Sequence, residues 1–193
     1  MTAHAAGHVS TVVHPVDDPD PTPPRLRAAS ATRQEPSEHD RQVVTRLLGR
    51  RPQGWFEVVV RRHDGSPVVL LNEPLLESGR PMPTRYWLVD RALVRAVGQL
   101  ESEGGVNQAE AEVDPEALRR AHDRYASERD AVIAPEHHGP RPSGGVGGTR
   151  IGVKCLHAHY ANLLAGNDDP VGRWVHRRLA EWGRAYDPAE PAP

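Results

Sequence analysis

The residues best suited to chemistry stand together at positions 153–159, Val-Lys-Cys-Leu-His-Ala-His, which hold the only cysteine of the chain, Cys155, and two histidines, His157 and His159. A thiolate is both a nucleophile and a soft metal ligand, and a neutral imidazole is a metal ligand and a general base. This segment therefore permits two chemistries, nucleophilic catalysis and metal binding. A single cysteine excludes an intrachain disulfide, which is typical of proteins of a reducing cytoplasm.

Nucleophilic catalysis depends on how this segment folds. The apolar pattern predicts a helix over 153–165, with Cys155 in its first turn, where free N–H groups and the helix dipole favour a thiolate. On a helix His159 shares the face of Cys155, whereas His157 points about 200° away; in an extended segment all three share one face. We therefore consider Cys155 as a nucleophile with His159 or His157 as its base. The simpler interpretation is a buried structural cysteine.

The segment 143–150, Ser-Gly-Gly-Val-Gly-Gly-Thr-Arg, suggests an anion site. Glycine-rich turns that lead into helix N-termini can bind phosphate, and Arg150 and Lys154 add positive charge. The pattern does not match the G-x-x-x-x-G-K-[ST] motif, because Lys154 lies beyond the loop and no strand is predicted before it. We favour a mobile connector and keep Arg150 and Lys154 as candidate anion-binding residues for an enzyme that acts on an anionic substrate.

The elements that must position these residues predict an α+β fold. Two runs rich in β-branched residues, 55–61 and 67–71, flank an Asp-Gly pair, which is a strong hairpin signal. Residues 84–89 predict a third strand, so the sheet should be small and antiparallel. Capping residues and apolar periodicity predict four to five helices packed with this sheet. The helices are expected to begin after Ser37, Asp90, Asp114, Gly152 and Asp169.

Composition separates a tail from a body. Residues 1–36 contain six prolines, no aromatic residue and no apolar periodicity. Burial there could not offset about 1–2 kcal/mol of backbone entropy per residue, so we predict a disordered Pro-rich tail. Residues 37–186 are expected to form a single α+β domain, and 187–193 a frayed C-terminus.

Charge and hydropathy exclude several classes of partner. The formal net charge is −2, which gives no global attraction to nucleic acid or to an anionic membrane. No apolar run approaches the roughly 18 residues of a membrane span, and no signal peptide is evident. Of 24 basic residues, Lys154 is the only lysine, a bias typical of a high-GC bacterial genome. We therefore expect a cytoplasmic bacterial protein, and we do not interpret its many arginines as a nucleic-acid site.

Four stretches together resemble the bacterial domain of unknown function 501 family. The most specific is GVKCLHAHYANLLAGNDDPVG at 152–172, and the similarity extends from about Arg51 to Leu179. The family name implies no activity. Its members are often encoded near cell-division and exopolyphosphatase genes, which leaves open a metal-free interaction module for division or envelope partners. The other three stretches are VRRHDGSPVV at 60–69, PMPTRYWLVD at 81–90 and the segment 93–104 with its Leu-Glu-x-x-Gly ending.

The resemblance also implies a set of metal ligands. Relatives commonly carry cysteine at the position of His63 and cysteine or histidine at that of Asp90, while the Cys-Leu-His of Cys155 and His157 is retained. All four residue types can bind a metal. We therefore predict a zinc site formed by His63, Asp90, Cys155 and His157, with His159 as a substitute. His63 and Asp90 are harder ligands than thiolates, and an iron–sulfur cluster is therefore disfavoured. The simpler interpretations are a turn residue for His63 and a helix N-cap for Asp90.

Overall fold

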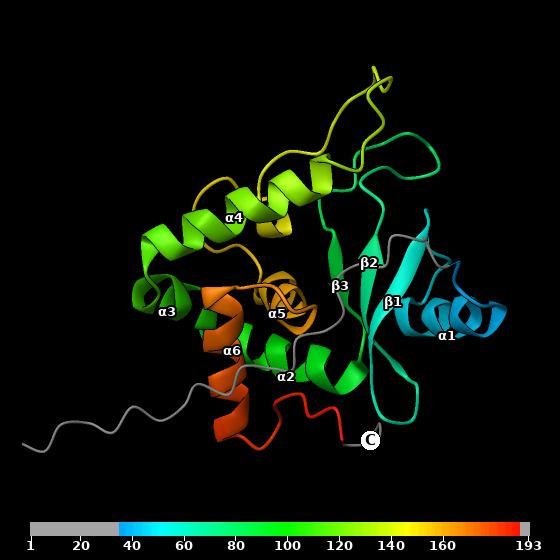
Figure 1. The fold of residues 1–193 in the computed structure, drawn as a ribbon. Coiled ribbons are helices and arrows are strands. Elements are labelled where there is room, and N and C mark those ends of the chain that lie inside the picture. Colours follow the sequence, from blue (N-terminus) through cyan, green and yellow to red (C-terminus); the bar gives the residue numbers. More distant parts are fainter. Residues whose placement is uncertain (1–34, 190–193) are drawn as a thin grey trace, which may run out of the picture.

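The computed structural model describes residues 35–189, in which a three-stranded sheet is packed between helices (Figure 1). Helix α1 lies beside one side of the sheet, and the other helices gather on the opposite side (Figure 1). The α+β architecture predicted from the sequence is confirmed. The predicted tail at 1–36 and frayed end at 187–193 fall largely outside the described residues.

The sheet starts with the predicted hairpin. Strands β1 (Phe56–Arg61) and β2 (Pro67–Asn72) pair antiparallel, and Gly65 in the turn between them has a φ of +85°, a conformation that favours glycine. Strand β3 (Tyr86–Leu88) pairs antiparallel with β2. The order is therefore β1-β2-β3, with β3 at one edge of the sheet.

Four helices begin at capping residues that the sequence predicts. The caps are Ser37, Asp90, Asp114 and Asp169, and each side chain accepts a hydrogen bond from a main-chain N–H group of the first helical turn. Such a cap contributes about 1 kcal/mol to stability. The helices that they start are α1 (Glu38–Leu48), α2 (Arg91–Ser102), α4 (Pro115–Asp130) and α6 (Pro170–Glu181).

Two helices depart from the sequence pattern. Helix α3 (Gly105–Glu112) was not expected; it starts immediately after Gly104, whose φ of +83° redirects the chain without a loop. Helix α5 (Leu156–Leu164) begins later than the predicted start at 153, and a short 3-10 turn, η1 (146–148), precedes it. Cys155 is therefore the N-cap residue of α5 and does not lie in its first turn.

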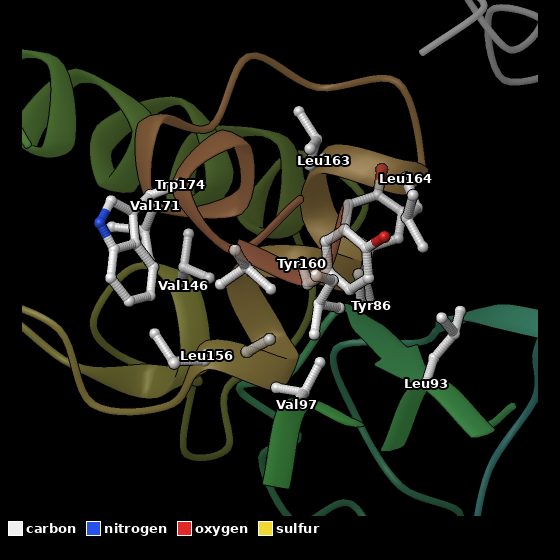
Figure 2. Packing of buried hydrophobic residues seen from close by; sticks show 14 of the residues in the cluster. Tyr86, Leu93, Val97, Val146, Leu156, Tyr160, Leu163, Leu164, Val171 and Trp174 are labelled. Atoms are coloured by element: carbon white, nitrogen blue, oxygen red, sulfur yellow. The ribbon is translucent and has the colours of Figure 1, made fainter. Parts of the chain in front are cut away.

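The core has one part on each face of the sheet. Helix α1 packs Val44 against Phe56, Leu70 and Val89 on one face. The larger part surrounds α5, which packs against β3, α2 and α6. Each fully buried large apolar side chain contributes about 2 kcal/mol relative to an exposed one. Figure 2 shows ten labelled members of the larger part: Tyr86, Leu93, Val97, Val146, Leu156, Tyr160, Leu163, Leu164, Val171 and Trp174.

Helices α5 and α6 cross at a glycine. A Cβ atom added to Gly172 would lie 2.6 Å from the Cβ of Leu163 and 2.6 Å from the carbonyl oxygen of His159. These distances are too short for any other residue, so Gly172 permits the close approach of the two helices.

No helix within residues 35–189 is both long enough and apolar enough to cross a bilayer.

Candidate functional site

The chain enters α5 in an extended conformation that two carboxylates hold in place. Cys155 has φ −151° and ψ 114°, and its side chain makes no capping hydrogen bond. The N–H of Val153 donates to Glu110 at 2.8 Å, and the N–H of Leu156 donates to Oε1 of Glu101 at 2.7 Å. Glu101 therefore takes the role of a helix cap for α5, although it lies on α2.

Three possible metal ligands converge at this point. One ligand atom each from Glu101, Cys155 and His157 lies within 4.8 Å of the other two. The Sγ of Cys155 is 4.0 Å from Nδ1 of His157, and Oε1 of Glu101 is 3.2 Å from the same nitrogen. The side chains of His157 and Glu101 are 25% and 28% exposed, so solvent reaches the group. We call these three residues the Cys-His-Glu cluster.

The second ring nitrogen of His157 fixes the orientation of the imidazole. Nε2 donates to the carbonyl oxygen of Val94 at 3.0 Å, which leaves Nδ1 to face Cys155 and Glu101. Burial opposes a charge on the ring, but hydrogen bonds with Cys155 and Val94 and the carboxylate of Glu101 outweigh it and raise the pKa of His157 to about 9. In the metal-free protein at neutral pH, His157 is therefore an imidazolium that donates from both nitrogens.

The structure does not bring His63 and Asp90 to this cluster. His63 is exposed in the turn between β1 and β2. Asp90 is buried, caps α2 through the N–H of Leu93 and forms an ion pair with Arg62 at 2.7 Å. Both side chains thus occupy the simpler roles of turn residue and N-cap, and Asp90 has a cationic partner in place of a metal.

The substitute ligand His159 also lies elsewhere. Its side chain is 1% exposed, and Nδ1 is 3.0 Å from each carboxylate oxygen of Asp169. Asp169 also accepts from Asn162 at 2.8 Å and from the N–H of Gly172 at 2.9 Å. Burial disfavours the carboxylate, but His159 and these donors outweigh it and keep the pKa of Asp169 below its usual value. We call His159, Asp169 and Asn162 the buried histidine cluster.

The Cys-His-Glu cluster borders a cavity of about 400 Å³. Cys155 and His157 line it on the side of α5, and Trp87 and Leu88 line it on the side of β3. The volume falls within the range of about 300–1,000 Å³ that is typical of small-molecule sites. The Cys-His pair is thus accessible from a concave surface, which a buried structural cysteine would not be.

The glycine-rich segment before α5 is packed against the body. The N–H of Val146 donates to Nδ1 of His122, whose pKa is lowered by burial and by His159, and the buried Arg129 donates to the carbonyl of Gly144. The candidate anion-binding residues Arg150 and Lys154 are both exposed, and neither lines the cavity. In the structure the segment therefore connects α4 to α5 and is packed against His122 and Arg129 of α4.

Glu101 is the member of the cluster that the sequence reasoning missed. Nothing in the local sequence links it to Cys155, which lies 54 positions further along the chain. One signal could have indicated it: Glu101 belongs to the Leu-Glu-x-x-Gly ending of one of the four stretches that carry the family resemblance.

Comparison with known proteins identifies one family. Residues 58–177 match the model of a protein family described as protein of unknown function (DUF501). The matched range includes all three members of the Cys-His-Glu cluster and all three of the buried histidine cluster. No curated protein and no solved structure shows significant similarity to the chain.

Proposed function

The chain belongs to the DUF501 family, and since the description of that family assigns no function, we propose from the geometry of the site that the protein binds zinc through Glu101, Cys155 and His157. The observation that supports this most is the convergence of Sγ of Cys155 and Oε1 of Glu101 on Nδ1 of His157. The zinc predicted from the sequence is retained as a proposal, but with Glu101 in place of His63 and Asp90.

The arrangement around His157 is the one that metal-binding histidines need. Metal-ligating histidines almost always donate their second ring N–H to a carbonyl or carboxylate, which fixes the tautomer. The bond from Nε2 to Val94 meets this requirement and leaves Nδ1 as the ligand atom. Loss of the Nδ1 proton would be the only change of protonation that zinc requires of His157, and Nε2 would keep its proton and its bond to Val94.

The donor set matches zinc in charge and type. A thiolate and a carboxylate carry two negative charges, which balance a divalent cation, and the neutral imidazole adds none. Sulfur, nitrogen and oxygen donors are typical of zinc, whereas magnesium and calcium prefer oxygen alone. Three protein ligands would leave the fourth tetrahedral position for water or a ligand, as in catalytic zinc sites. The cavity beside Cys155 and His157 supplies the space for it.

Elemental analysis of purified, untagged protein tests this proposal. We expect about one zinc per chain after equilibration with zinc and gel filtration. Cys155→Ala and Glu101→Gln should lose it, while the matched variants His63→Ala and Glu103→Gln should keep it. Glu103 is an exposed carboxylate on the same helix end, so it controls for charge alone. Zinc that persists in Cys155→Ala, or its absence from the wild type, would contradict the proposal.

The Cys155–His157 contact also supports a second candidate, a thiol-dependent enzyme. Sγ lies 4.0 Å from Nδ1 at the wall of a cavity, and Val94 orients the ring as the third group of a nucleophile–base pair would. Glu101 weakens this candidate because it competes for the same nitrogen. An alkylation rate of Cys155 that is high at pH 7 and independent of pH from about 6 to 8 would favour the enzyme. A rate that rises through this range as for an ordinary thiol would oppose it.

A further inference from the structure

We infer that the cavity beside the Cys-His-Glu cluster binds the carboxylate-bearing end of an N-acylated amino acid with an apolar side chain, either free or at the C-terminus of a peptide. The inference names a class of ligand for the site proposed above. It rests on the proposed zinc site only for the part of the binding free energy that a bound zinc would add. Three features of the cavity point to the three parts of such a ligand: its walls, its cationic end and its free strand edge.

The walls of the cavity suit an apolar side chain. Aliphatic side chains of Leu48, Val94 and Ala158 and the aromatic rings of Tyr86 and Trp87 line most of it. An aliphatic or aromatic group placed there would be removed from water, which favours binding by about 25 cal/mol for each Å² of apolar area buried.

The cationic end of the cavity suits a carboxylate. Arg50 lines this cavity and also a second one of about 200 Å³, and Trp87 borders both, whereas Cys155 and His157 border only the first. Arg50 and Trp87 therefore stand where the two cavities adjoin, and no member of the cluster does. Its guanidinium lies 5.8 Å from the centre of the Trp87 ring, a cation–π contact that orients it. Within residues 35–189 it forms no ion pair, so its donors are available to an anion.

The free edge of β3 suits an amide. Trp87 is the partner of Leu70, and the N–H of Val89 donates to Val68, so these two positions face β2. Leu88 lies between them and directs its N–H and carbonyl away from β2, toward the open edge. No hydrogen bond from residues 35–189 reaches these two groups of Leu88. An acyl-amide placed along this edge would pair with them as an added strand does.

Protection of Cys155 from alkylation tests the inference. Cys155 is the only cysteine and lines the cavity, so its modification by iodoacetamide in the metal-free protein, followed by mass spectrometry, reports occupancy of the cavity. The probe is N-acetylphenylalanine. Its carboxamide tests the anion, and N-acetylglycine tests the apolar side chain. We expect the probe to protect Cys155 at concentrations about tenfold lower than either of these two compounds.

Matched variants assign the carboxylate to Arg50. Arg50→Gln should abolish the preference for the acid over its amide, whereas Arg51→Gln, at an exposed neighbour outside the cavity, should retain it. Equal protection by acid and amide, no protection up to about 10 mM probe, or an unchanged preference in Arg50→Gln would overturn the inference.

The same assay separates the two sources of the ligand and the two proposals. A hexapeptide that ends in phenylalanine and binds more tightly than N-acetylphenylalanine supports a polypeptide C-terminus, and weaker binding by the hexapeptide supports a free acylated amino acid. Zinc content is measured on the same preparations. Protection in metal-free protein that never binds zinc would refute the zinc site and support the ligand class, whereas zinc binding without protection would do the reverse.

Discussion

His157 and His159 stand two residues apart on α5, yet their surroundings are opposite. His157 is a quarter exposed, borders the cavity and shares one nitrogen between a thiol and a carboxylate. His159 is sealed in the core, and its Nδ1 is held by both oxygens of a carboxylate that has two further donors of its own. In the first arrangement, solvent can reach the ring nitrogen that would bind a metal. In the second, the ring nitrogen is bonded to a carboxylate and links α5 to the start of α6.

The contrast shows how one short motif can serve two purposes. In a helix, residues two apart point in different directions, so His157 and His159 cannot share a partner. The Cys-Leu-His-Ala-His segment thus directs one histidine to a surface site and the other to the buried carboxylate of Asp169. The difference predicts that substitutions in the two clusters will have separable effects on zinc binding and on stability.

The largest expected effect is on stability, in the buried histidine cluster. Asp169→Ala removes the partner of His159 and the cap of α6, and it should lower the free energy of unfolding by about 3–5 kcal/mol, because a buried imidazole and an amide lose their acceptor. Urea denaturation measures this. Asp168→Ala, at the exposed neighbour, should change it by less than about 0.5 kcal/mol. A loss below about 1 kcal/mol in Asp169→Ala would show that the buried pair does not hold the two helices.

The next effect is on zinc, in the Cys-His-Glu cluster. His157→Gln should weaken zinc binding at least about 100-fold, since loss of even an outer partner of a ligand costs about 10–100-fold. Its free energy of unfolding in the presence of a chelator should change by less than about 1 kcal/mol, because the side chain is part-exposed. Competition with a chromophoric chelator gives the affinity. A variant that loses stability but keeps zinc would reverse the roles of the two histidines.

Zinc affinity should also depend on pH in a direction set by His157. Because its pKa is raised to about 9 in the metal-free protein, zinc must displace a proton from Nδ1 at any lower pH. The zinc dissociation constant should therefore fall by about tenfold or more for each unit of pH between 6.5 and 8.5. Chelator competition over this range measures the slope. A dissociation constant that does not change with pH would exclude His157 as a ligand.

The smallest effect is the pH dependence of stability in the metal-free protein. The pKa of His157 is about 9 in the folded protein and about 6.5 in an unfolded chain. The contribution of protonated His157 to the free energy of unfolding is therefore present in full below pH 6.5 and is lost as the pH rises to 9. Solvent screening limits it to about 1 kcal/mol. The wild type should lose this stability between pH 6.5 and 9, and Glu101→Gln should lose less of it. Titration of His157 by NMR near pH 6.5 in the wild type would contradict this account.

The fold could be predicted largely because its signals are local. The Asp-Gly turn and the caps Ser37, Asp90, Asp114 and Asp169 each act within a few residues, and each occurs where the sequence indicates. Helix α3 could not be predicted in this way, because it has only two buried positions, Gly105 and Ala109, and therefore little apolar periodicity.

The candidate site could be predicted only in part, because its third member is distant in sequence. Cys155 and His157 are neighbours and were identified together, whereas Glu101 reaches them only because α2 packs against α5. The start of α5 was misplaced for a related reason. The carboxylates of Glu101 and Glu110 hold residues 153–156 by tertiary contacts that a propensity pattern does not contain.

X-ray absorption at the zinc edge of the loaded wild-type protein tests the Cys-His-Glu cluster most directly. The account predicts one sulfur at about 2.3 Å from zinc and two to three nitrogen or oxygen ligands at about 2.0–2.2 Å. The spectrum should be unchanged in His63→Ala, and the sulfur should disappear in Cys155→Ala. A wild-type spectrum without a sulfur neighbour would place the metal elsewhere and contradict the account.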